Sequence, residues 1–487
     1  MPTSRIRSRW VVGHAEGGHR LLRDGEVVWR GDTILFVGRG YDGPVDEEID
    51  AGNAVTGPGF VDLNALADLD STVLAFDNQP DHEKGRVWPE AYLEAGPREV
   101  YTDAEQDFGR YYAMVQLLRN GITTAQPIAS LLYRAWSETY DEMARMADLA
   151  GGLGIRLFVG PAYLTGLTYL RADGGFDRHF DEPRGLAGLA DAVRFVRDHD
   201  GRHGGLINGM LAPDRIETCT PELLRRTARA RAELGCPVRL HCCQSRYEFD
   251  TVRRLHGRTP IQWLRDLDFL GPRVMLPHGL FLTGTSYTDL PGTADQEILA
   301  ASGATLVTCP LVGARYASGM ESFARYRRMG IRIGMGTDTY PPDMLSNLRE
   351  AVHICRIAEK DETALSAAEV YTAATSGGAD ALGRPDLGRL APGCKADITI
   401  IRLDAFEMGQ VFDPIQALVL TGTGRDVDTV VVNGRKVVRA RQLPGVDLDA
   451  LRDRAQAQYE KLMATYPERA PGNPPAARIF TPSFPAL

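Results

Sequence analysis

The sequence predicts an α/β protein: a (β/α)8 barrel of the TIM type, with a small β-sandwich domain built from both ends of the chain. Between residues 57 and 385, short apolar runs alternate with amphipathic stretches, as expected when parallel strands are each followed by a helix. On either side, short apolar runs are separated by glycine-containing turns, which is typical of hairpins. We therefore divide the chain into a first sandwich part (1–56), the barrel (57–385), a second sandwich part (386–445) and a C-terminal helix with a proline-rich tail (446–487).

The β-domain is predicted from short alternating runs near both ends. Residues 26–29 and 33–37 read as strands, with turns expected at 23–25 and 30–32. The same texture returns late in the chain, at 396–401 and 429–434. Two β-rich ends around a different middle favour one small domain to which both contribute.

The barrel elements follow from the alternation in the middle of the chain. Apolar runs predict strands, and longer runs with helical periodicity predict helices between them. The strands are expected at 155–159, 238–240, 274–276, 304–307 and 331–335, and the helices at 111–119, 138–150, 186–198, 221–234, 260–267 and 347–359. After the β-domain, 446–468 has helical spacing, and 471–487 is expected to be extended, either on a neighbouring subunit or loosely ordered.

Three polar residues follow predicted strands directly. His241, His278 and Asp338 each come after an apolar run. Because the carboxyl ends of barrel strands share one face, where active sites are built, we expect these three side chains to converge at one mouth.

Composition limits the classes of function. The chain has 487 residues with 44% hydrophobic and 24% charged residues and a formal net charge of −9, and its Lys and Arg residues are dispersed. It therefore lacks the basic footprint of a nucleic-acid-binding protein. No apolar run is long enough to cross a membrane, and no secretory signal is recognisable at the start. Seven cysteines without disulfide-like spacing favour a reducing compartment, so we expect a cytoplasmic protein.

Several motifs occur in a characteristic order along the chain. Taken together they resemble the amidohydrolase superfamily, in particular its triazine-hydrolase and nucleobase-deaminase branch. The motifs are Gly57-Pro58-Gly59-Phe60-Val61-Asp62, Leu276-Pro277-His278-Gly279, Thr308-Cys309-Pro310, Gly334-Met335-Gly336-Thr337-Asp338 and Gly388-Arg389-Leu390-Ala391-Pro392-Gly393.

This resemblance implies a hydrolase of a C–N or related bond in a small molecule. It implies that His241 is a metal ligand, that Asp338 is both a ligand and the general base, and that His278 polarises the substrate or serves as a further ligand. In such a site a divalent metal activates a water molecule. The resemblance also implies a homodimer or homotetramer.

The chain departs from the family pattern at four positions of the predicted site. Asn64 and Leu66 stand where the family has a His-x-His pair, Gln244 stands at a proton-shuttling glutamate, and Asp214 stands at a substrate-contacting histidine. Leucine cannot bind a metal, and an asparagine carbonyl is a weak ligand beside imidazole. We therefore expect at most one divalent ion (Zn, Fe or Co), with Asn64 as an additional ligand candidate, and a metal-free site is an open alternative.

Other residues are candidates for compensation or substrate binding. An acidic loop containing Asp68, Asp70 and Asp77 either supplies carboxylates to the mouth or is solvated. Substrate contacts are expected from Gln244, Asp214, Tyr163 and Arg315, the first two through their family positions and the last two through predicted loops. Two further readings of the chain stay open: a metal-free lyase, isomerase or cyclase that uses a His/Asp acid–base pair, and a non-catalytic pseudoenzyme.

Overall fold

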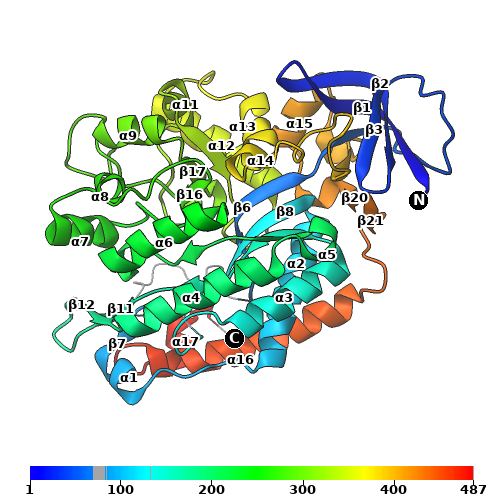
Figure 1. Ribbon diagram of the computed structural model, residues 1–487. Coiled ribbons are helices and arrows are strands. Elements are labelled where there is room, and N and C mark those ends of the chain that lie inside the picture. The colour runs from blue at the N-terminus through cyan, green and yellow to red at the C-terminus, as the bar shows by residue number, and fades with distance from the viewer. Residues whose placement is uncertain (70–82, 84, 132, 486–487) are drawn as a thin grey trace.

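The computed structural model describes residues 1–69, 83, 85–131 and 133–485 and contains an eight-strand barrel at its centre (Figure 1). Two four-stranded parallel sheets form it, in the orders β13-β9-β8-β6 and β15-β16-β17-β18. Their bounds are β6 (Phe60–Leu66), β8 (Ile122–Ile128), β9 (Arg156–Val159), β13 (Ile207–Gly209), β15 (Val238–Arg239), β16 (Val274–Pro277), β17 (Thr305–Thr308) and β18 (Arg332–Met335). The predicted strands match these within one or two residues.

Backbone hydrogen bonds join the edges of the two sheets. The N–H of Arg239, in β15, donates to the carbonyl of Leu211 just after β13 at 3.1 Å. At the other edge, the N–H of Asp338 donates to the carbonyl of Asn64 in β6 at 2.9 Å. The sheets therefore close into a barrel, as the sequence predicts, and the second of these bonds fixes a predicted catalytic residue to the first strand.

Helices surround the barrel and carry caps that the sequence encodes. Thr102 and Thr139 form reciprocal capping boxes with Glu105 and Glu142 at the starts of α2 and α3. The helices are α1 (Glu90–Ala95), α2 (Asp103–Arg119), α3 (Tyr140–Leu153), α4 (Glu182–His199), α5 (Arg202–Gly205), α6 (Pro221–Leu234), α7 (Arg246–His256), α8 (Pro260–Asp266), α9 (Ala294–Ser302), α10 (Pro310–Arg315), α11 (Phe323–Arg328), α12 (Met344–Glu359), α13 (Ala367–Ala373), α14 (Ser376–Ala381) and α15 (Pro414–Leu420).

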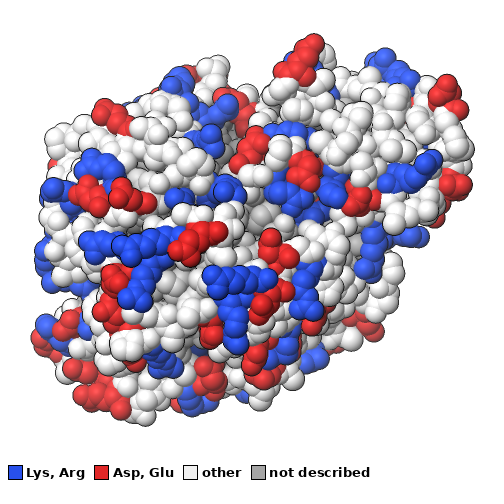
Figure 2. All heavy atoms as spheres, in the orientation of Figure 1, with Lys and Arg blue, Asp and Glu red and all other residues white. Residues whose placement is uncertain are grey.

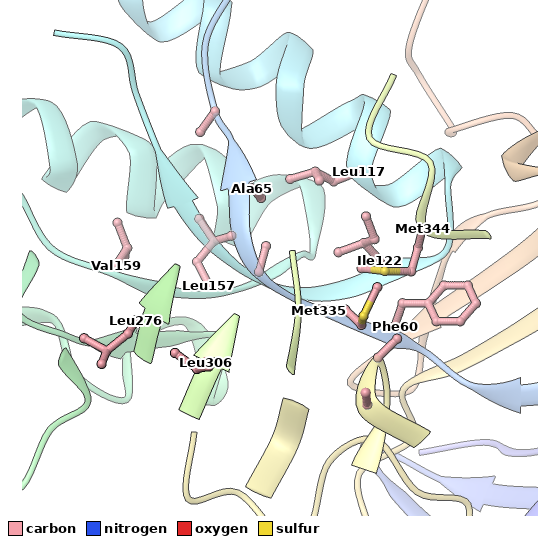
Figure 3. Close-up of a cluster of buried hydrophobic side chains, with 14 of the residues drawn as sticks. Phe60, Ala65, Leu117, Ile122, Leu157, Val159, Leu276, Leu306, Met335 and Met344 are labelled. Carbon is pink, nitrogen blue, oxygen red and sulfur yellow. The ribbon is translucent and has the colours of Figure 1, made fainter. Parts of the chain in front are cut away.

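The main hydrophobic core lies between barrel strands and the surrounding helices. Figure 3 shows Ala65 of β6, Leu157 of β9 and Leu276 of β16 among apolar side chains that include Leu117 from α2. All four are completely buried. This packing holds the strand ends, and hence the polar residues that follow them, in fixed relative positions.

Strands from both ends of the chain form one hydrogen-bonded sheet, in the order β21-β20-β19-β5-β1-β2-β3 with β4 beside β1 (Figure 1, upper right). β5 and β19 are the antiparallel pair that joins the N-terminal to the C-terminal strands. The bounds are β1 (Thr3–Ala15), β2 (Gly18–Arg30), β3 (Thr33–Gly38), β4 (Glu47–Asp50), β5 (Ala54–Pro58), β19 (Ile398–Arg402), β20 (Val427–Val432) and β21 (Arg435–Val438). This sheet has a small core of its own, centred on Ile6, Trp29 and Ile398.

One predicted turn in this domain is wrong. Residues 23–25 lie inside β2, where Arg23 pairs with Trp10 and Gly25 with Ser8 of β1. The chain reverses earlier, at Glu16 and Gly17, both of which have positive φ. Asp24 also has a positive φ of 50°, so the turn-like residues mark an irregularity within a long hairpin.

Short strands lie beyond the ends of the barrel strands. They are β7 (Trp88–Pro89), β10 (Ala162–Tyr163), β11 (Gly166–Leu170), β12 (Phe176–Phe180) and β14 (Ala212–Pro213). The central strand β11 pairs with β7 on one side and with β12 on the other. Trp88, Leu167 and Thr168 from this group line the cavity at the mouth. These short strands form part of the cavity wall and were not predicted from the sequence.

The C-terminal segment packs against its own chain. The predicted helix is α16 (Leu448–Arg469), and it is followed by a short helix, α17 (Ala476–Ile479). Ile479 is buried, and the ring of Phe480 lies 5.3 Å from that of Tyr466 in α16. The prediction of an extended or loose tail is therefore wrong for residues 476–480, because its apolar residues find a partner in α16.

A buried ion network lies between α2 and α3. The Glu142 carboxylate accepts hydrogen bonds from Arg134 Nη1 at 2.7 and 2.9 Å and from Arg110 Nη2 at 3.1 Å. Burial alone would raise the pKa of Glu142, but the two guanidinium groups outweigh it and hold the pKa at about 2. The folded state therefore favours the charged carboxylate more than the unfolded chain does.

This shift predicts an acid-sensitive contribution to stability. The contribution is fully present above the ordinary pKa of 4.5 and is lost as the pH falls through about 2. We expect Glu142 to contribute about 3 kcal/mol to the free energy of unfolding near neutral pH. Urea denaturation of wild type and Glu142→Gln should show a difference that shrinks below pH 4.5. A difference that is independent of pH would contradict this account.

Charges are mixed over the surface. In the view of Figure 2, Lys and Arg side chains lie beside Asp and Glu side chains over most of the face. Within the described residues, the helices include none that is both long and apolar enough to span a membrane.

Candidate active site

The three predicted strand-end residues meet at the mouth of the barrel. His241 follows β15, His278 follows β16, and Asp338 lies three residues after the end of β18. All three line one cavity with a volume of about 770 Å³. The expectation that they converge is therefore confirmed by their positions.

Their side chains form a compact acid–base group. His278 Nε2 lies 3.8 Å from Asp338 Oδ2, and the ring centroids of His278 and His241 are 5.6 Å apart. His241 Nδ1 is 3.0 Å from the backbone carbonyl of Asp214. Because that contact places the proton of a neutral ring on Nδ1, His241 Nε2 is left as an acceptor or ligand atom.

The backbone at this site is strained. His278 has a φ of 80° and Asp338 a φ of 46°, in the left-handed region that residues with a Cβ seldom adopt. Such conformations cost of order 1–3 kcal/mol each and concentrate at functional sites. The Asp338 conformation is held by its hydrogen bond to Asn64, and that of His278 by an N–H donated to the carbonyl of Val307 at 2.8 Å.

Burial dominates the electrostatics of the three groups. It raises the pKa of Asp338 to about 7 and lowers the pKa of His278 to about 3. The pKa of His241 is also depressed by burial. Arg215 is the next contributor in each case: its positive charge lowers the pKa of both histidines and of Asp338.

Asn64 has a different environment from that of an ordinary metal ligand. Its Nδ2 donates to Cys309 Sγ at 3.7 Å, and its backbone N–H donates to Asp62 Oδ1 at 3.0 Å. Its Oδ1 is buried and has no hydrogen-bond partner among the residues that the structure describes. Asp62 also accepts from the N–H and hydroxyl of Thr337 at 3.1 and 2.6 Å. Strand β6, which has Asn64 and Leu66 in place of a His-x-His pair, therefore positions the loop that carries Asp338.

The donor atoms present fit a single metal ion. Ligand atoms of His278, Cys309 and Asp338 all lie within 4.8 Å of one another, and His278 Nε2 is buried with no hydrogen-bond partner in the described part of the chain. An imidazole, a thiolate and a carboxylate are ligands typical of zinc and other transition metals. Leu66 lines the same cavity and contributes only carbon atoms.

Cys309 is a site residue that the sequence analysis did not propose as a ligand. It immediately follows β17 and lines the cavity beside Asp338. Its motif, Thr308-Cys309-Pro310, carried the necessary signal, because a polar residue after a seventh strand should face the same mouth as those after the fifth, sixth and eighth.

Two arginines at the site were also missed. Arg239 is buried in β15, two residues before His241, and its Nη1 donates to the carbonyls of Gln126 and Pro127 at 3.1 and 2.8 Å. Arg215 lies in the segment between β14 and the 3₁₀ helix at Ile216–Thr218, and its Nη1 donates to Gln244 Oε1. Arg239 lies two residues before His241, so the two side chains are expected on the same face of the strand, and this pattern could have revealed Arg239. No comparable pattern marked Arg215.

The predicted substrate-binding residues divide into two groups. Gln244 and Asp214 line the cavity. Tyr163 is completely buried, with its hydroxyl 3.0 Å from Thr227 Oγ1 in α6, so it belongs to the core. Arg315 Nη1 donates to the carbonyl of Tyr340 at 2.8 Å and therefore supports the loop after Asp338. The structure does not bring Tyr163 or Arg315 to the cavity wall.

The predicted acidic loop supplies no site carboxylate within the described residues. The carboxylate of Asp68 accepts a hydrogen bond from the Tyr133 hydroxyl at 2.8 Å, which gives it a structural partner. Asp70 and Asp77 lie outside the described residues.

Residues 100–437 match the amidohydrolase family. The chain belongs to this family. The predicted resemblance to the amidohydrolase superfamily is therefore confirmed, and so is the barrel fold that it implies. The matched region contains His241, His278, Cys309 and Asp338, whereas β6, with Asn64 and Leu66, precedes it.

Among curated amidohydrolase-family relatives, a 5-methylthioadenosine/S-adenosylhomocysteine deaminase from Pelotomaculum thermopropionicum is 27% identical over 92% of this chain and 96% of its own. An adenosine deaminase from Xanthomonas campestris with bound zinc superposes with a TM-score of 0.77, at 22% identity, over 94% of this chain and 98% of that one. Atrazine chlorohydrolase from Arthrobacter aurescens TC1, complexed with zinc, superposes with a TM-score of 0.75, at 22% identity, over 94% and 100%. Both of these solved structures contain bound zinc.

Proposed function

We propose that the protein hydrolyses a C–N bond in a small planar molecule, with Asp338 as the general base. The hydrolase class is supported by membership of the amidohydrolase family and by deaminases among its relatives. The observation that carries the assignment to this site is the 3.8 Å approach of His278 Nε2 and Asp338 Oδ2 at the mouth of the cavity.

Asp338 is suited to move a proton. Hydrolysis of a C–N bond requires a base that removes a proton from water and an acid that returns one to the leaving nitrogen. Without a bound ion, burial raises the pKa of Asp338 to about 7, near neutral pH, so its carboxyl group can accept and then release a proton. The neutral imidazole of His278 orients the water or polarises the bond that is attacked.

A single divalent ion would be held by His278 and Asp338, with Cys309 and His241 as neighbouring ligand candidates. When bound, such an ion lowers the pKa of water and supplies positive charge. Asn64 and Leu66, in the first strand, leave no His-x-His pair for the usual ligand set.

The residues that line the cavity suit a flat substrate. Its walls combine the apolar side chains of Leu66, Trp88 and Phe281 with a small number of polar groups, which is the usual composition of a small-molecule site. Adenosine-type and triazine-type heterocycles, the compounds named for the relatives, are therefore the first substrates to test.

The activity test is an ammonia-release assay combined with mass spectrometry of the products. The panel would contain adenosine, 5′-methylthioadenosine, S-adenosylhomocysteine and atrazine, and loss of chloride would be followed for the last. We expect release of ammonia or an amine from at least one planar heterocycle, and this release should depend on Asp338. Release of chloride from atrazine alone, which breaks a C–Cl bond, would contradict hydrolysis of a C–N bond. The absence of turnover across a broader panel of amino- and amide-substituted heterocycles would contradict the proposal.

Metal content gives a second, independent prediction. Protein purified without chelators should contain about one zinc, iron or cobalt ion per chain, as in a site with three protein ligands. His278→Ala should lower this content, and Cys309→Ala should lower it if the thiolate is a ligand. Elemental analysis of matched preparations measures both effects. Less than about 0.2 ion per chain after zinc, iron and cobalt are each supplied would contradict a metal-dependent site.

A metal-free reaction is the second candidate. It is favoured by Leu66 in the cavity wall, where a ligand is expected, and by Gln244, whose amide cannot transfer a proton. Neutral His278 beside Asp338 would then act alone as an acid–base pair in elimination or isomerisation. Activity that survives strong chelation but is lost in Asp338→Asn would identify this alternative.

We also propose that the protein works in the cytoplasm as a homodimer or homotetramer. Its seven cysteines are all free thiols, which supports a reducing compartment. Sedimentation equilibrium measures the oligomeric state.

A further inference from the structure

Arg215 is a cation inside the candidate active site that has no ion-pair partner among the described residues. Its backbone forms a bridge with His241, and the following N–H, of Ile216, donates to the carbonyl of His241 at 3.1 Å. The side chain therefore starts directly beside a predicted catalytic histidine. It lines the cavity together with His241, His278 and Asp338.

Gln244 fixes the guanidinium group of Arg215 through a neutral contact. Arg215 Nη1 donates to Gln244 Oε1, and the backbone N–H of Gln244 donates to Glu248 Oε2 at 2.8 Å. A glutamate at position 244 would neutralise the arginine, whereas the glutamine amide leaves its positive charge intact. With its oxygen occupied, the Gln244 side chain offers only N–H donors to a ligand.

The charge of Arg215 has no carboxylate partner among the described residues: none of their carboxylate oxygens lies within 4.0 Å of its guanidinium nitrogens. Asp214 and Glu217 line the same cavity; burial raises the pKa of both carboxyl groups, and the positive charge of Arg215 opposes part of this rise without an ion-pair contact. A half-buried guanidinium without an ionic partner is costly unless a ligand provides one.

We propose that Arg215, held by Gln244, binds a carboxylate or another planar oxyanion of the substrate beside the reacting bond. This rests on the proposed function and narrows its substrate class to small planar molecules that carry such a group. The guanidinium presents its remaining N–H groups as a fork that matches the two oxygens of a carboxylate. The adjacent amide of Gln244 adds a further donor beside the guanidinium group.

The test compares two probes that share a ring and differ in charge: benzoate and benzamide. Isothermal titration of the full-length protein, before and after treatment with EDTA, measures both affinities without requiring turnover. We expect benzoate to bind about tenfold more tightly than benzamide, as charge-assisted hydrogen bonds imply. The preference should persist after EDTA treatment, because the guanidinium and not an ion provides it.

Variants assign this preference to Arg215. Arg215→Gln removes the charge and Gln244→Glu neutralises it by a new ion pair, so both should reduce the preference for benzoate to about twofold or less. Arg246→Gln removes one charge from the rim of the same cavity, where Arg246 donates to the Tyr287 carbonyl, and should keep the preference. Thermal unfolding checks the fold of each variant, and Gln244→Glu stands in if Arg215→Gln does not fold.

The proposal is overturned if wild type does not prefer benzoate, or if folded Arg215→Gln or Gln244→Glu retains the preference. Equal losses in Arg246→Gln and Arg215→Gln would also overturn it, because they would indicate a general effect of cavity charge. Failure of the hydrolysis assay with preserved benzoate selectivity would instead contradict the proposed reaction alone.

Discussion

Asp338→Asn is expected to reduce turnover of any hydrolysed substrate by about 10³-fold, because general acid–base catalysis typically contributes 10²–10⁴-fold. Asparagine has nearly the same shape but cannot accept the proton. The backbone contact from residue 338 to Asn64 does not involve the side chain and should persist in the variant. The measurement is the steady-state rate of ammonia or product release, with circular dichroism to verify the fold.

A matched control uses the same substitution at a distance. Asp453 lies in α16, outside the residues that line the cavity, and its side chain is 71% exposed, so Asp453→Asn should leave turnover unchanged. Retention of more than about a tenth of the wild-type rate in Asp338→Asn would exclude it as the base. Loss of metal together with loss of activity would show that Asp338 serves as a ligand as well.

Asp397→Ala is expected to lower the free energy of unfolding by about 3–5 kcal/mol, because it leaves a buried arginine without its partner. Asp397 Oδ2 and Oδ1 accept from Arg156 Nε and Nη2 at 3.1 and 3.2 Å, and Oδ1 also accepts from the Asn433 N–H at 2.7 Å. The side chains of Arg156 and Asp397 are 0% and 2% exposed. The pair connects β9 of the barrel to the sheet formed by the chain ends.

The control for this substitution is an exposed ion pair. Asp191 lies 3.2 Å from Arg194, and their side chains are 50% and 57% exposed. Asp191→Ala should cost less than about 1 kcal/mol, as exposed pairs usually do. Urea denaturation of both variants gives the comparison, and equal costs would contradict the role assigned to the buried pair.

The residues predicted correctly from sequence share a simple geometric reason. His241, His278 and Asp338 each follow an apolar run, and a polar residue at the end of a parallel barrel strand has one destination. The same geometric reason applies to Cys309, which directly follows β17 and so lies at the same mouth. Where a polar residue follows a barrel strand, a single sequence therefore suffices to place its side chain at the mouth of the barrel.

Tyr163, which was predicted wrongly, and Arg215, which was missed, lie outside the barrel strands. Tyr163 was expected in a mouth loop, but it belongs to β10 and points toward α6. Arg215 reaches the cavity from an irregular segment, and its position depends on the bridge to His241 and on Gln244, two contacts between residues far apart in sequence. Neither periodicity nor composition encodes such contacts.

The pairing of β5 with β19 has a consequence for biosynthesis. Ile398 pairs with Pro58 and Arg402 with Ala54, so the whole barrel is translated between the two partners. During synthesis, the edge of β5 that faces β19 and the buried Arg156 remain without their partners until Asp397 and β19 have left the ribosome. A truncated product would therefore expose both an open strand edge and an unpaired charge, which are features that favour aggregation and degradation. The pairing of β5 thus depends on synthesis having passed β19.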